Sequence, residues 1–344
     1  MTRSRKPLTA RRVAAWLALL GAVLAASIAL GISLGAGHVS PLRLVSGGDG
    51  LDPVERAILL EVRLPRVLLA ALLGGSLSLA GVVFQALLRN PLADPYVLGV
   101  SGGASIGGVL ALVAGLGGGS VLAGLGVPVF AFAGAMGALF LIERIATVGG
   151  RLTVYTVLLT GAVFNAFSAA LIYFIQSIAS LEQLHAIVFY LMGRVPSLSP
   201  RGIGLLAIAI GVAALALVRT SRDYNALSLG EEGALQLGVP VESLKRRTFV
   251  LGSLLTALAV AVAGMIGFVG LVVPHILRLL FGPDHRLLLP AAFLGGAAFL
   301  VVADLVSRIA IAPNELPVGV VTALVGGPFF LYLLRRRSAS HGFA

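Results

Sequence analysis

The side chains that could do chemistry in this chain are few and widely separated. The 344 residues include 14 Asp and Glu, five His and no Cys. Without Cys the chain can form neither a disulfide nor a thiolate metal site, and the His residues lack metal-ligand spacing. No nucleophile stands beside a base in a recognisable motif. We therefore expect no catalytic residue, no bound metal and no cofactor.

A nucleotide-binding loop is also missing from the sequence. A P-loop requires Gly-Lys-Ser/Thr, whose lysine reaches the phosphates. The two lysines of the chain, Lys6 and Lys245, follow Arg5 and Leu244 instead. If ATP drives this protein, another subunit must hydrolyse it.

One acidic and one basic residue lie at helical spacing inside an apolar stretch. Asp304 and Arg308 are four residues apart, acid first, which favours an ion pair on one helix face. We interpret them as a structural pair. The alternative is a proton relay, as in an ion-coupled secondary transporter, but such carriers usually place several ionisable residues inside their spans. A membrane-embedded enzyme is the third class of function that we compared.

The elements that hold these residues are apolar. Hydrophobic residues make up 58% of the chain, charged residues 11%, and mean hydropathy is +1.03, so the surplus apolar surface must face lipid. We predict an all-α polytopic membrane protein, a single domain over residues 1–344 with about ten transmembrane helices. The expected spans are Val13–Leu34, Val67–Leu88, Val97–Gly115, Val121–Ile142, Val154–Ile178, Gly202–Val218, Thr248–Gly264, Ile266–Phe281, Leu287–Ile309 and Val318–Leu334.

The basic residues set the orientation of these spans. With the N-terminus in the cytoplasm, 18 of the 25 Lys and Arg residues lie on the inner side, which agrees with the positive-inside rule. The cytoplasmic parts are then a basic tail at 1–12, a loop at 219–247 and a tail at 335–344, so both termini are inside. The net charge of +11 is spread around apolar segments, which argues against nucleic-acid binding.

Four segments are unusually polar or proline-rich for a membrane protein. Glu61–Arg66 (EVRLPR) predicts a rigid, positively charged corner at a proline turn on the outer side. Helix-breaking prolines near residues 89–95 predict a structured re-entry between two helices. Leu227–Val239 (LSLGEEGALQLGV) predicts a short amphipathic helix, followed by another over 240–246. The fourth segment is the C-terminal third.

These stretches resemble the FecCD-type permeases of ABC transporters, which import iron-siderophores, haem or cobalamin. The similarity covers residues 55–335, where RLPR, QxxxRNPLAxP, LGEExAxxLG, GFVGLxxPHxxR, DHRxLLP and ELPVGxxTAxxGxPFF occur in the family order. The resemblance implies the type II ABC importer permease fold, and a homodimer in the bacterial inner membrane. Its implied partners are two copies of an ATPase subunit and a periplasmic or lipoprotein substrate-binding protein.

The resemblance also implies roles for particular residues. Binding-protein docking falls on Arg63, Arg66 and Arg308. Coupling to the ATPase falls on Leu229, Gly230, Glu231, Glu232, Ala234 and Gly238. The translocation gate falls on Asn90, Pro91, Leu92, Val154 and Tyr155, although Val154 and Tyr155 differ from the small hydroxylated residues of cobalamin-type members. The expected cargo is an iron chelate, a ferric siderophore or haem, with cobalamin as the alternative.

Overall fold

The chain is a bundle of helices with one very short hairpin. The computed structural model describes residues 9–35, 52–116 and 123–340, so residues 1–8 and 341–344 of the predicted tails lie outside the described residues. The elements are α1 (Ala10–Ser33), α3 (Pro53–Ala57), the π-helix η1 (Ile58–Arg63), α4 (Leu64–Leu87), the 3₁₀ helix η2 (Pro95–Leu98), α5 (Val100–Val113), α6 (Ala123–Ala146), β1 (Thr147–Val148), β2 (Arg151–Leu152), α7 (Val154–Ile178), α8 (Leu181–Met192), α9 (Pro200–Arg219), α10 (Ser221–Leu227), α11 (Glu231–Gln236), α12 (Val241–Ala263), α13 (Val269–Phe281), α14 (His285–Ile309) and α15 (Val318–Ser340).

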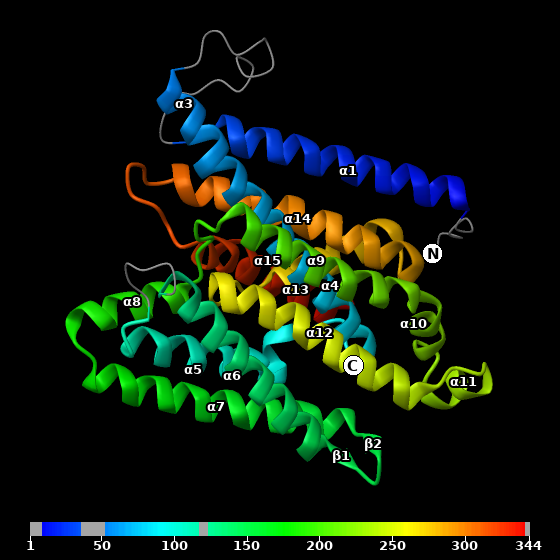
Figure 1. Cartoon of the computed structure of the whole chain (residues 1–344). Helices are drawn as coiled ribbons and strands as arrows, with labels where there is room; N and C mark the ends of the chain where they lie inside the picture. The colour runs from blue at the N-terminus through cyan, green and yellow to red at the C-terminus, as the bar shows by residue number, and fades with distance from the viewer. Residues whose placement is uncertain (1–8, 36–51, 117–122, 341–344) are drawn as a thin grey trace.

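Helix α4 forms the centre of the bundle. It packs most extensively against α14 and also contacts α12 and α13, while α1 lies along the outer side of α14 (Figure 1). Residues 73–85 of α4 are all buried. A helix that is apolar all round is expected in the interior of a bundle, so the composition of α4 accounts for its central position.

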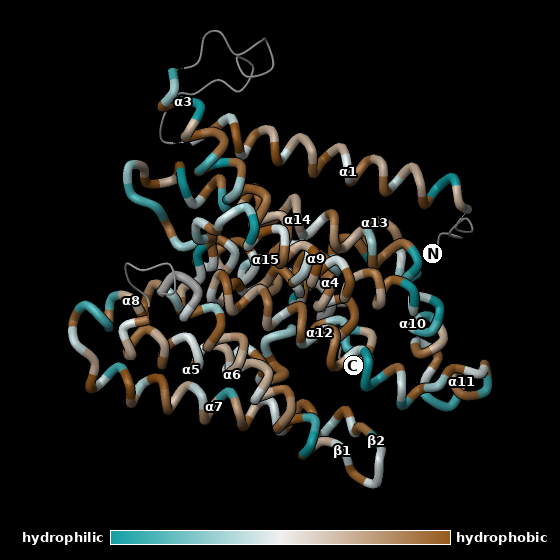
Figure 2. Tube along the Cα trace, in the orientation of Figure 1, coloured by the Kyte–Doolittle hydropathy of each residue, from teal (hydrophilic) through white to brown (hydrophobic). Residues whose placement is uncertain are grey.

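The two ends of the bundle carry different elements. In Figure 1 the start of α1, the helices α10 and α11 and the β1–β2 hairpin lie at one end, on the right. The helices α3 and α8 and the loop between α14 and α15 lie at the other end, on the left. Hereafter these are the α11 end and the α3 end. Hydrophilic segments gather at both ends, whereas the helices between them are mainly hydrophobic (Figure 2).

Every predicted span overlaps a helix, although residues 121 and 122 of the span Val121–Ile142 lie outside the described residues. Seven helical segments in the described part of the chain are long and apolar enough to cross a membrane: α1, residues 53–87, α6, α7, α9, α12 and α14. The other three predicted spans correspond to shorter apolar helices, α5, α13 and α15. Large apolar side chains are exposed on the peripheral helices, among them Phe167 on α7 and Leu205 on α9, as expected of surfaces that face lipid.

Glycine allows close approaches of the backbone in the bundle, and Gly103 and Gly264 are two examples. A Cβ on Gly103 of α5 would lie 2.4 Å from the carbonyl oxygen of Gly134 on α6, so the glycine spacing of α5 serves helix packing. Gly264 ends α12 with φ +69°, and a Cβ there would lie 1.9 Å from the carbonyl oxygen of Tyr190. The non-helical residues 264–268 separate α12 from α13, at the point where the sequence predicts a break.

Helix α8 and the segment Glu61–Arg66 differ from the sequence prediction. Helix α8 has only 12 residues, too few for a spanning pattern, although the capping box of Ser180 and Gln183 was a usable signal for its start. The segment EVRLPR forms no proline turn. It lies within continuous helix, where the π-helix η1 directly precedes Pro65 at the start of α4. Proline has no backbone N–H and is tolerated in the first turn of a helix.

Candidate functional site

The predicted coupling segment lies at the α11 end and exposes leucines. Helix α11 begins after Gly230, whose φ of +106° suits glycine, and it spans Glu231–Gln236 rather than the predicted 227–239. Leu229, Leu235 and Leu237 are 72%, 58% and 63% exposed, whereas Ala234 is fully buried. The segment therefore rests on the bundle through Ala234 and directs three leucines outward.

The surroundings of α11 differ from the prediction in one further way. The expected second short helix over 240–246 is the first part of the long helix α12, because no helix-breaking residue follows Pro240. Glu232 is exposed, and Gly238 closes the segment in the left-handed region with φ +81°. Glu231 is half-buried and pairs with Lys245 of α12 at 3.1 Å.

The preceding helix, α10, is tied to the bundle. The Asn225 amide donates to Asp284 Oδ1 at 2.8 Å, and its carbonyl oxygen accepts from the backbone nitrogen of His285 at 2.9 Å. Hydrogen bonds from the Arg286 guanidinium hold the pKa of Asp284 well below its usual range. These hydrogen bonds hold α10 on the start of α14. Helix α11 follows α10 in the chain and is not part of this contact.

The two predicted gate segments both adjoin α11. After α4 the chain turns at Arg89, whose φ is +47°, and Asn90 Oδ1 accepts the backbone N–H of Leu92 at 3.0 Å across Pro91. Arg89 and α11 line a hollow of about 450 Å³. Val154 and the 73%-exposed Tyr155, at the start of α7, line another hollow of about 520 Å³ with α11 and α12.

The predicted docking arginines lie at the α3 end, and two of them are not exposed. Arg63 and Arg308 are each only 6% exposed. Arg63 donates to the carbonyl oxygens of Ile32 and Ser33 at 3.1 and 3.2 Å, and Arg308 donates to that of Gly31 at 2.9 Å. The last carbonyls of a helix have no partner within it. The guanidiniums therefore cap the C-terminal end of α1, and the positively charged corner predicted at residues 61–66 is wrong for Arg63.

The structural pair is part of a larger ion cluster. Asp304 is fully buried and forms an ion pair with Arg308 at 3.1 Å, as their spacing of four residues predicts. Asp304 also accepts Arg66 Nε at 3.0 Å. Arg66 in turn donates to both carboxylate oxygens of Glu315 at 3.0 and 2.9 Å. The outer cluster is therefore Arg63, Arg66, Asp304, Arg308 and Glu315, and Glu315 was not predicted.

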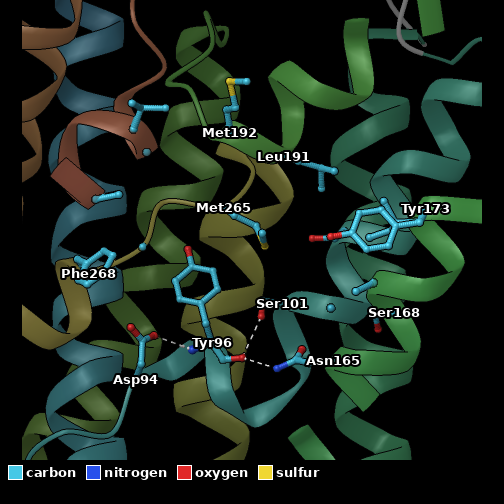
Figure 3. A pocket seen from close by; sticks show the side chains of 18 residues that line it. Asp94, Tyr96, Ser101, Asn165, Ser168, Tyr173, Leu191, Met192, Met265 and Phe268 are labelled. Atoms are coloured by element: carbon cyan, nitrogen blue, oxygen red, sulfur yellow. Dashed lines mark hydrogen bonds between the residues drawn. The ribbon is translucent and has the colours of Figure 1, made fainter. Parts of the chain in front are cut away.

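A cavity of about 600 Å³ lies between these two ends (Figure 3). Its lining comes from residues 94–105, from α7, from the end of α8, from the segment 264–268 between α12 and α13, and from α15. Apart from Asp94, every lining side chain is apolar or an uncharged polar group. Among the described residues, no group of three His, Cys, Asp or Glu side chains is arranged to hold a metal ion.

Much of the polar lining is engaged within the protein. The Tyr96 carbonyl oxygen accepts from Ser101 Oγ at 3.2 Å and from Asn165 Nδ2 at 2.9 Å, and Asp94 accepts the Tyr96 N–H at 2.9 Å. The Tyr96 hydroxyl is bonded to the backbone of Ile266. The cavity therefore has a nearly neutral lining, with Asp94 as its one acidic residue. The cavity was not predicted from the sequence, because its lining residues are scattered over distant segments. The polar residues Asn165 and Ser168 on an apolar helix were the available signal.

Comparisons with known proteins agree with this architecture. The model of the FecCD transport family matches residues 23–336. An uncharacterised ABC transporter permease of Bacillus subtilis (strain 168) is 45% identical over 330 residues, covering 91% of both chains. The cobalamin import system permease of Halobacterium salinarum is 39% identical and covers 96% of this chain and 90% of its own. The hemin transport system permease of Yersinia pestis is 40% identical, covering 81% of this chain and 84% of its own.

A solved structure is similar over nearly the whole chain. It is described as an inward-facing conformation of an ABC transporter of the metal-chelate type. It matches with a TM-score of 0.82 and 31% identity, covering 93% of this chain and 98% of that one. The chain therefore belongs to the FecCD transport family and is a membrane-spanning permease subunit of an ABC importer.

Proposed function

We propose that this permease moves an iron chelate, haem or a ferric siderophore, across the bacterial cytoplasmic membrane. The observation that carries the proposal is the cavity of about 600 Å³ with its nearly neutral lining. A bulky chelate that is handed over and released needs a passage without strong charges, whereas a bare metal ion needs a cluster of ligands. The hemin permease of Yersinia pestis supports haem as one such cargo.

Cobalamin is the second candidate cargo. The cobalamin permease of Halobacterium salinarum is 39% identical, about as similar as the hemin permease. The same cavity suits a corrin as well as a porphyrin, because its lining has few groups that select between them. Val154 and Tyr155 are the residues that favour the iron chelates, since they depart from the small hydroxylated side chains of cobalamin-type members.

A transport assay separates these cargoes. Proteoliposomes containing the permease and its ATPase receive binding protein loaded with haem, a ferric siderophore or cobalamin, and ATP-dependent uptake is measured. Uptake of haem or the siderophore supports the proposal, and uptake of cobalamin alone supports the second candidate. The absence of uptake of all three, with ATP hydrolysis unaffected by loaded binding protein, contradicts both.

The exposed leucines support α11 as the docking site of the ATPase. Leu229, Leu235 and Leu237 are exposed in and beside α11, at an end of the bundle where hydrophilic segments gather, which fits a helix-in-groove contact. The chain itself lacks a P-loop, so ATP hydrolysis is assigned to the partner. In the proposed assembly two permease chains form a homodimer with two ATPase subunits, and both termini and α11 face the cytoplasm.

We assign the binding protein to the α3 end. Of the three predicted docking arginines, Arg66 is the most accessible, with a side chain 17% exposed. With three arginines and two carboxylates the outer cluster carries a formal charge of +1, which attracts an acidic partner. A partner carboxylate that approaches Arg66 meets Glu315 already bound there, so the two carboxylates compete for one guanidinium.

A further inference from the structure

A buried lysine joins three elements at the α11 end. Lys245 is 4% exposed in the second turn of α12. Its Nζ lies 3.1 Å from Glu231 Oε2, on the first residue of α11, and 2.6 Å from Glu242 Oε1. The other carboxylate oxygen of Glu242 accepts the backbone N–H of Leu152 at 2.9 Å. These four residues are the inner cluster.

The inner cluster leads from α11 to the start of α7. Leu152 is the last residue of β2, and α7 begins two residues later at Val154. Helix α11 and the start of α7 face each other across a hollow of about 520 Å³, which Glu231, Glu242 and Lys245 also line. Direct packing across a hollow transmits little movement, whereas the ion pairs along its wall connect the two elements.

We propose that Lys245 is a positioning residue that transmits displacement of α11 to the start of α7. The inference rests on the proposed docking of the ATPase at α11. A buried ammonium keeps its carboxylate partners because separating them leaves an uncompensated charge. When the ATPase moves α11, Glu231 pulls Lys245 with it. Glu242 is bound to Lys245 and to the Leu152 backbone, so the start of α7 moves as well.

The absence of cysteine from this chain makes a direct test simple. Tyr155, 73% exposed at the start of α7, is replaced in a reporter variant, Tyr155→Cys. The reporter is assembled with the ATPase in proteoliposomes, and its rate of reaction with a soluble maleimide is measured with and without ATP. Co-purification of the ATPase is measured in parallel.

Lys245→Met removes the charge and keeps much of the volume. We expect the ATPase still to co-purify, because the leucines of α11 are untouched, while the ATP-dependent change in labelling falls by about 2- to 30-fold. Lys245→Arg restores most of the change, since it keeps a cation for both carboxylates. The matched control is Arg247→Met, an exposed cation two residues along the same helix, which leaves the labelling change as in the reporter.

The outcomes distinguish the role of Lys245 from the docking of the ATPase at α11. A full ATP-dependent change in Lys245→Met overturns the inference. If that variant fails to fold, Glu242→Gln decides, because it keeps an acceptor for Leu152 and removes one ion pair; a full change there is equally contradictory. If the ATPase does not co-purify with the reporter variant itself, the docking proposal fails, and the inference fails with it. A merely structural lysine would lower stability without changing the response to ATP.

Discussion

The two ion clusters at opposite ends of the bundle are built from different cations. In the outer cluster, arginine side chains are bound both to carboxylates and to the terminal carbonyls of α1. In the inner cluster a single ammonium meets two carboxylates whose side chains are 36% and 42% exposed. A planar guanidinium fixes several acceptors at once, whereas an ammonium is a compact point charge on a flexible stem.

Because of this difference, we expect the outer cluster to hold its helices in one arrangement and the inner cluster to allow movement of the elements that it connects. Asp304 is fully buried between Arg66 and Arg308, so the helices α1, α4 and α14 are held in one arrangement at the α3 end. Glu231 and Glu242 are each partly solvated, so the inner ion pairs can shift position with a smaller penalty while the buried ammonium of Lys245 keeps both partners. The outer cluster therefore suits a platform of constant shape, and the inner cluster suits a connection that moves without breaking.

The largest expected effect is the loss of the outer carboxylate. Asp304→Ala leaves the buried Arg308 without its carboxylate partner, while Arg66 keeps Glu315. An uncompensated buried charge costs about 3–5 kcal/mol of folding free energy. We expect a much lower unfolding temperature of the purified permease in detergent. Lys245→Met should cost less, since its partners reach solvent. Equal destabilisation by the two variants would contradict the distinction between the clusters.

The sequence predicted the outer pair but not the outer cluster. Asp304 and Arg308 are four residues apart, so helical periodicity alone brings them together. Arg66 and Glu315 lie 238 and 11 residues from Asp304, and their contacts depend on how α4 and the loop before α15 pack against α14. The same limit applies to Arg63, whose partners are backbone carbonyls of α1 and leave no trace in side-chain identity.

The inner end shows a similar division. The exposed face of α11 follows from the pattern of Leu229, Glu231 and Leu235, and the predicted gate segments follow from proline positions and family motifs. The pairing of Lys245 with Glu242 follows from their spacing of three residues on one helix. The contact of Lys245 with Glu231 does not follow, because α11 and α12 are joined by a turn whose geometry sets the distance. Helix spans were predictable from apolar runs, whereas the short helix α8 and the cavity depended on tertiary packing.

An intermediate effect is expected from the surface that the ATPase should cover. Replacing Leu229, Leu235 and Leu237 by serine removes the apolar contact next to the inner cluster, and truncation of buried interface side chains costs roughly 1–3 kcal/mol. The ATPase should then dissociate during co-purification, with the permease still folded. Val148→Ser, an equally exposed apolar side chain on the hairpin, is the control; loss of the ATPase from this variant but not from the triple variant would contradict docking at α11.

The smallest expected effect tests competition within the outer cluster. Glu315 is 53% exposed, so its ion pair with Arg66 contributes roughly 0.2–1 kcal/mol. Glu315→Gln raises the formal charge of the cluster from +1 to +2 and frees Arg66 for an acidic partner. We expect binding-protein affinity to rise by about 1.5- to 5-fold at low salt, and the gain to shrink as salt screens the charges. Measured by titrating the binding protein onto the permease in nanodiscs, an unchanged or lower affinity would show that Glu315 does not compete for Arg66. Because Asp304 rather than Glu315 holds the outer cluster together, the unfolding temperature of this variant should stay close to that of the parent protein.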